Sequence, residues 1–163
     1  MIPEILVHIG DMTVSFALLE WHLKVLTGSF ICEHQRATQI ITAELSFKQT
    51  LALASSLYLE RHGKDGDYST LRSLIGKATR IEDERNLITH SIWTAAEEPG
   101  EVGRVKTTAK IRKGYAFQFE KMNASDFKLI ADRIKSLGDE VLHFYCHLVS
   151  QKKAINNPSA KFW

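Results

Sequence analysis

The sequence contains no apolar run that approaches the roughly 20 residues needed to cross a lipid bilayer. Its first residues carry acidic side chains within an apolar pattern and no basic leader, so we expect neither a signal peptide nor a membrane anchor. Cysteine is also scarce, because only Cys32 and Cys146 are present and their spacing matches no disulfide framework. Reduced thiols are therefore expected, together with a cytoplasmic location and no membrane partner.

Two common catalytic motifs are missing as well. The chain has neither a glycine-rich phosphate loop of the type G-x-x-x-x-G-K-[ST] nor a G-x-S-x-G sequence. ATP hydrolysis by such a loop and esterase chemistry are therefore disfavoured, and no cofactor is expected. His143 and His147 flank Cys146 at a spacing that can hold zinc in a helix, but no second ligand pair accompanies them, so no metal site is assigned.

The length and the charge distribution suggest one domain with a basic part. With 163 residues, of which 44% are hydrophobic, we expect a single core-forming domain over residues 1–150 and a C-terminal tail over 151–163. Residues 1–103 carry 9 Lys and Arg against 14 Asp and Glu, whereas residues 104–163 carry 12 against 5. Clustered cations attract polyanions without sequence preference, so the basic part is either a phosphate-binding surface or a solvated face.

Apolar residues recur every three or four positions through most of the chain, which predicts four or five helices. Ser46 and Asn123 are the expected N-caps of two of them, and the Gly63–Gly66 turn ends the helix that begins after Ser46. The predicted helices cover about residues 2–28, 34–44, 47–62 and 67–93, with a last helix from 124 to about 148. In the first helix a second apolar stripe, formed by Val14, Leu18, Trp21 and Val25, needs either the core or a partner chain to cover it, so we expect a homodimer.

Between residues 104 and 121 the period changes to two, which predicts a β-hairpin. Pairing Ile111 with Tyr115 would leave a three-residue loop that ends in Gly114 and would keep the apolar residues on one face. The other face of the first strand presents Lys106, Lys110 and Arg112 as candidate binding residues for an RNA backbone. The expected fold is therefore mainly α, a four- to five-helix bundle with a β-hairpin inserted before the last helix.

One charge interrupts the apolar seam of the predicted 67–93 helix. The position between Ile81 and Ile88 that should continue the seam is Arg85. Burying a cation costs several kcal/mol unless a carboxylate or a bound anion neutralises it. An ion pair with a neighbouring carboxylate, Glu82, Asp83 or Glu84, is the simplest explanation, and a bound phosphate is the other.

The residues after Arg85 supply further polar chemistry. Asn86 can form hydrogen bonds, and His90 is suited to transfer protons in either direction near neutral pH. The run Arg85-Asn86-Leu87-Ile88-Thr89-His90 resembles the Arg-x4-6-His motif of the HEPN superfamily of helical ribonucleases and nucleotide-binding domains. The topological resemblance, which includes a hairpin before the last helix, extends over about residues 1–150.

The resemblance implies a metal-independent endoribonuclease that dimerises to form one cleft from two copies. His90 would then assist attack of an RNA 2′-hydroxyl, Arg85 would stabilise charge on the phosphate, and Asn86 would orient one of them. On a straight helix Arg85 and His90 point about 140° apart, so a local distortion or a second chain is needed to bring them together. The family association also suggests a toxin or a phage-defence effector with an antitoxin or other regulatory partner.

Two alternatives remain from the sequence. The chain is a catalytically silent module of this type that binds nucleotide, RNA or a protein, or it is a structural helical dimer. In the second case Arg85 is ion-paired and His90 has no role. RNA cleavage in the presence of EDTA separates the enzyme from both alternatives, and salt-sensitive RNA binding separates the two alternatives from each other.

Overall fold

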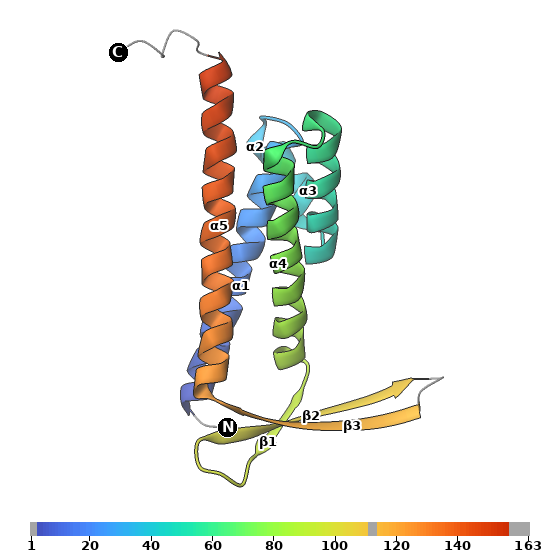
Figure 1. The fold of residues 1–163 in the computed structure, drawn as a ribbon, viewed down its shortest axis with the longest axis vertical. Helices are drawn as coiled ribbons and strands as arrows, with labels where there is room; N and C mark the ends of the chain where they lie inside the picture. Colours follow the sequence, from blue (N-terminus) through green and yellow to red (C-terminus); the bar gives the residue numbers. More distant parts are fainter. Residues whose placement is uncertain (1–2, 111–113, 157–163) are drawn as a thin grey trace. The chain divides into compact units, whose positions relative to one another are not determined.

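The computed structural model describes residues 3–110 and 114–156, with only the backbone described for 106–110, 114–118 and 153–156. Over these residues the chain is mainly helical, with one antiparallel sheet before the last helix (Figure 1). This confirms the predicted fold class. The elements are α1 (Pro3–Ser29), α2 (Gln35–Ala43), α3 (Phe47–His62), α4 (Gly66–Thr89), β1 (Ile92–Ala95), β2 (Glu101–Lys110), β3 (Gly114–Asn123) and α5 (Ala124–Asn156).

The predicted N-caps are confirmed in detail. The Ser46 hydroxyl accepts a hydrogen bond from the Gln49 backbone N–H, and the Gln49 side chain accepts one from the Ser46 backbone N–H. Asn123 and Asp126 form the equivalent reciprocal pair at the start of α5. Each pair satisfies backbone donors that the first helical turn leaves without partners.

The helices contribute to two compact units. The first contains α1 up to Phe16, together with residues 80–135, and the second contains residues 17–79 with α5 from Ser136 onward. The first unit buries residues of the predicted apolar seams: Ile5, Met12, Phe16, Ile81, Ile88, Phe127, Ile130 and Ile134. The second unit does the same with Leu19, Leu23, Leu26, Leu51, Tyr58, Leu71, Leu74, Leu137 and Val141. No helix of the described residues is both long and apolar enough to span a membrane.

The end of α4 differs from the prediction. The helix ends at Thr89, and the next residues form β1, which pairs antiparallel with β2 through Ile92↔Val105 and Trp93↔Arg104. The expected hairpin is therefore part of a three-stranded sheet in the order β1-β2-β3. Ile92 was assigned to the helical seam because it lies four residues after Ile88, but as a strand residue it is 65% exposed.

The hairpin register also differs, by two residues. Ala109, and not Ile111, pairs with Tyr115, and the two ten-residue strands pair along their whole length. A shift of two preserves the alternation of faces, and it places Val105 opposite Phe119, where the expected register would have placed Lys121. The observed register places Arg104 directly opposite Glu120, where the two side chains form an ion pair, whereas the expected register would have placed Met122 there.

Most of the second apolar stripe of α1 is exposed in the part of the chain that the structure describes. Val14 is 71% exposed, Leu18 53% and Trp21 55%, and Val25 is partly buried. Of the two explanations for this stripe, burial in the core of the chain is therefore wrong for these three side chains.

Candidate functional site

Arg85 lies partly buried near the end of α4, in the first unit. Its guanidinium carbon is 5.0 Å from the centroid of the Phe16 ring, a cation–π contact, and its Nη1 donates a hydrogen bond to the Asn86 side-chain oxygen at 2.9 Å. The Arg85 Nε is buried and has no hydrogen-bond partner. The structure therefore brings Arg85 and Asn86 together and leaves part of the guanidinium unsatisfied.

Arg85 forms no ion pair with a carboxylate of any described residue. Glu84, one of the expected partners, binds Arg133 on α5 at 3.0 Å. A cation on a helix seam without a carboxylate is costly to desolvate, and a bound anion would remove that cost. The ion-pair explanation for Arg85 is therefore not realised among the described residues.

His90 occupies a turn one residue beyond α4, and its side chain is exposed. Its backbone N–H donates to the Asn86 carbonyl at 3.0 Å, but its imidazole forms no hydrogen bond with a described residue. Of the three predicted site residues, Arg85 and Asn86 are thus joined through their side chains, whereas His90 is bonded to Asn86 only through its backbone. Within one copy of the described chain, no hydrogen bond connects the His90 imidazole to the Arg85 guanidinium.

Four donors near this turn bind the last carbonyl groups of α4. Thr89 Oγ1 binds the Arg85 carbonyl at 3.0 Å, and the His90 backbone N–H binds that of Asn86. The Ser91 hydroxyl donates to the Leu87 carbonyl. Trp93 Nε1 donates to the Ile88 carbonyl at 3.1 Å. These bonds satisfy acceptors that a helix end otherwise exposes, and they hold the His90 turn against the helix.

Trp93 also anchors this turn to the rest of the first unit. Its ring centroid lies 5.1 Å from that of Phe127 at the start of α5. Because Trp93 is in β1, the position of the sheet relative to α5 within this unit decides where the residues between α4 and β1 lie. His90 is among those residues, so its placement depends on tertiary contacts as well as on the helix.

Arg104 is a residue of this region that sequence reasoning missed. Only 2% of it is exposed, although it lies on the strand face that was expected to be solvated. Its Nη2 binds Glu120 at 2.5 Å, and its Nη1 lies 3.4 Å from the Ser91 hydroxyl. Arg104 therefore connects the sheet to the segment that follows α4. A correct hairpin register would have revealed it, because that register sets Arg104 directly opposite an acidic residue.

The predicted RNA-binding cations lie mostly beyond what the structure describes. Lys106 and Lys110 are in β2, with backbone positions only, and Arg112 lies outside the described residues. No group of three or more His, Cys, Asp and Glu side chains suited to a metal ion occurs in the described parts of the chain. His147 contacts Asp67 at 3.1 Å.

No protein-family model, curated protein or solved structure matches this chain. The resemblance to HEPN ribonucleases therefore rests on the residues from Arg85 to His90 and on the order of the elements.

Proposed function

We propose that this chain is a metal-independent endoribonuclease of the HEPN type, which binds an RNA phosphate at the end of α4. The observation that carries the proposal is the partly buried Arg85, which has no carboxylate partner among the described residues and keeps a buried Nε without a hydrogen bond. Guanidinium groups bind phosphate oxygens through several N–H donors at once. A phosphate at Arg85 would therefore satisfy the group that the protein leaves incomplete.

The neighbouring residues take roles that follow from their chemistry. Asn86 holds one Arg85 nitrogen at 2.9 Å and so restricts the orientation of the guanidinium. His90, exposed at the helix end, accepts the proton of the attacking 2′-hydroxyl, and Arg85 stabilises the charge that develops on the phosphate oxygens. As the 2′-oxygen bonds to phosphorus, the P–O5′ bond breaks to leave a 2′,3′-cyclic phosphate, and protonated His90 returns its proton to the departing 5′-oxygen. The same reaction requires His90 and Arg85 to contact one phosphate.

A homodimer supplies that arrangement. Because no hydrogen bond joins the His90 imidazole to Arg85 among the described residues, a second copy that brings its own His90 to this Arg85 would complete the site. The exposed Val14 and Leu18 on α1 are the kind of apolar surface that a partner copy covers. We further propose that the dimer acts in the cytoplasm as a toxin or phage-defence effector and is controlled by an antitoxin or another regulatory partner.

A catalytically silent RNA-binding module is the second candidate. It is favoured because the His90 imidazole forms no hydrogen bond with Arg85 or Asn86 among the described residues, and phosphate binding needs only the latter two. This module would bind RNA in a salt-sensitive manner and would not cleave it.

The decisive experiment is incubation of the purified protein with RNA in EDTA. His90→Ala should lower the cleavage rate by a factor of about 10² to 10⁴ and leave RNA binding intact, because it removes only the proton-transfer group. Arg85→Ala should lower both affinity and rate. His143→Ala and Arg80→Ala change exposed residues of the same types on helices α5 and α4 and serve as matched controls.

Mixing the two inactive variants tests the shared site. A heterodimer of His90→Ala and Arg85→Ala regains one intact pair when the two residues come from different chains, so part of the activity should return. Wild-type cleavage in either single variant would end the catalytic assignment. Light scattering that shows only a monomer at micromolar concentration would contradict the dimeric site, and RNA binding without cleavage would favour the silent module.

A further inference from the structure

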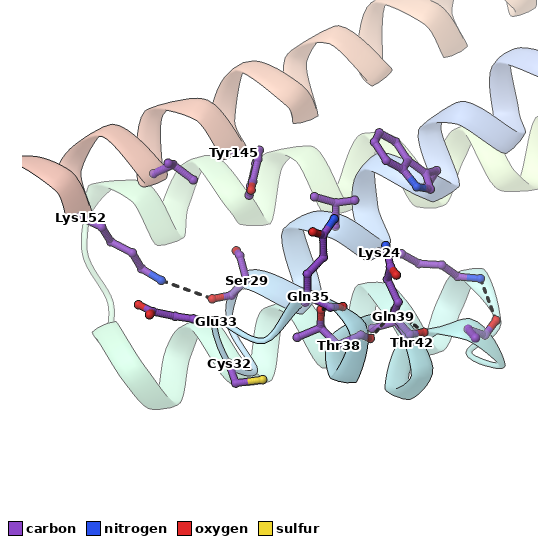
Figure 2. Close-up of a pocket in the computed structure, with 15 residues that line it drawn as sticks. Lys24, Ser29, Cys32, Glu33, Gln35, Thr38, Gln39, Thr42, Tyr145 and Lys152 are labelled. Carbon is purple, nitrogen blue, oxygen red and sulfur yellow. Dashed lines mark hydrogen bonds between the residues drawn. The ribbon is translucent and has the colours of Figure 1, made fainter.

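The second unit contains a cavity of about 570 Å³. It lies where the last turns of α1, helix α2 and the end of α5 meet (Figure 2). Its volume is in the range of about 300–1,000 Å³ that is typical of small-molecule sites. The residues that line the cavity all belong to the second unit, whereas Arg85 and His90 belong to the first.

The walls of the cavity are partly apolar and aromatic. Trp21 and Val25 contribute from α1, and Tyr145 and Val149 contribute from α5. Aromatic side chains offer flat surfaces against which a planar ligand packs. The apolar part of a ligand would therefore contact α1 and α5.

The polar groups of the cavity have unused hydrogen-bonding capacity. The Gln35 amide and the Tyr145 hydroxyl form no hydrogen bond with a described residue, although both line the cavity. Figure 2 shows Tyr145 and Lys152 extending from α5 on one side of the cavity, with Gln35 and Thr38 of α2 across from them. A ligand between these elements can both donate and accept hydrogen bonds.

The charges of the cavity limit the charge of its ligand. Lys24 is already neutralised by Glu20 at 3.2 Å and also donates to the Ala43 carbonyl at 3.1 Å. Lys152 donates to the Ser29 carbonyl at 3.3 Å and forms no ion pair with a described residue. Glu33 adds a negative charge to the lining. Among the described residues that line the cavity, one ammonium group is thus available for an anion, and a second negative charge on the ligand would meet Glu33.

We propose that this cavity binds a small aromatic monoanion, such as an aryl carboxylate or sulfonate. The aromatic body packs on Trp21 and the two valines, and the anionic group binds Lys152. The polar edge of the ligand meets Gln35 and Tyr145. Nucleoside triphosphates do not suit this site, because their several negative charges exceed the one cation available among the described lining residues.

The two free cysteines provide a site-specific test. Cys32 lines the cavity, whereas Cys146 is exposed outside its lining. The probe is 8-anilinonaphthalene-1-sulfonate, an aromatic monoanion, and the rate of alkylation of each cysteine is followed by mass spectrometry. At a probe concentration about ten times its Kd, occupancy should slow alkylation of Cys32 about tenfold and leave Cys146 unchanged.

Matched ligands and variants separate the parts of the proposal. N-phenyl-1-naphthylamine has the same aromatic body without the sulfonate and should protect Cys32 at least fivefold less well. ATP, which carries several negative charges, should also protect Cys32 at least fivefold less well. Lys152→Glu should weaken protection of Cys32 by the sulfonate about fivefold and leave protection by the neutral compound unchanged. The control is Lys48→Glu, the same change on the exposed face of α3, which should alter protection by neither compound. Protection is compared with and without ligand in each variant, because a change of charge also alters thiol reactivity.

Three results would overturn the proposal. Unprotected Cys32 at saturating probe would show that the cavity is not the binding site. Equal protection by the neutral compound would remove the anion requirement, and equal protection by ATP would remove the limit to one charge.

Discussion

Arg104 and Glu120 form an ion pair whose two members should differ sharply in their importance for stability. The Arg104 side chain is 2% exposed, whereas the Glu120 side chain is 56% exposed. Glu120→Ala leaves the guanidinium buried with only the distant Ser91 hydroxyl, at 3.4 Å, as a partner. Stranding a buried charge costs about 3–5 kcal/mol. Because water reaches Glu120 and screens part of the attraction, we expect a loss of about 3 kcal/mol, at the lower end of that range.

Arg104→Met should have a much smaller effect. Methionine keeps most of the buried volume of the arginine stem and removes the charge, and the half-exposed Glu120 then regains water. The substitution also eliminates the buried Nε of Arg104, which has no partner and whose burial costs about 1–3 kcal/mol. These gains offset the lost ion pair, so the free energy of unfolding should change by no more than about 1 kcal/mol.

Urea denaturation of both variants provides the test. Lys121→Ala is the control, because it removes an exposed residue that lies 3.7 Å from Glu101 on the same sheet and should change stability by less than about 0.5 kcal/mol. The reasoning fails if Arg104→Met destabilises the protein as much as Glu120→Ala. That result would mean that packing of the arginine, and not the stranded charge, dominates.

Two further predictions concern local geometry. Asp65 accepts a hydrogen bond from the Tyr68 backbone N–H at 2.7 Å, which holds the pKa of Asp65 below its usual value. Its stabilising contribution is therefore full above the unfolded-state pKa of about 3.9 and is lost as the pH falls through the folded-state pKa. The melting temperature of Asp65→Asn should thus lie below that of the wild type at pH 7 and converge with it at acidic pH, and a constant gap would argue against this linkage. In Gly103→Ala, the new Cβ would lie 2.4 Å from the Phe119 ring, so we expect the free energy of unfolding to fall by about 1–3 kcal/mol. Adding Phe119→Ala in the same chain should partly relieve this loss of stability. Additive effects of the two changes would contradict this contact.

Much of the helical structure was predictable because its determinants are local. The capping box of Ser46 and Gln49 and the equivalent pair at Asn123 and Asp126 join residues three positions apart, so their effect does not depend on the rest of the fold. The apolar periods likewise identified the residues that the two units bury, from Ile5 to Val141. The unusual position of Arg85 on an apolar seam was also visible in the sequence.

The remaining features depend on contacts between distant parts of the chain. The end of α4 was misplaced because its carbonyl groups are capped by Ser91 and Trp93, and Trp93 is held by β2 and Phe127. The hairpin register could not be read from the alternation of faces, which a shift of two residues satisfies equally well, and the observed register sets Arg104 opposite Glu120.

The candidate sites show the same division. The sequence by itself identified Arg85, Asn86 and His90 as residues with suitable chemistry, because residue types and their spacing are local properties. Only the tertiary structure decided that Arg85 contacts Asn86 and Phe16 in place of a carboxylate. The cavity was invisible in the sequence for the same physical reason, since α1, α2 and α5 contribute to it from opposite ends of the chain and no local pattern records which helices will pack together.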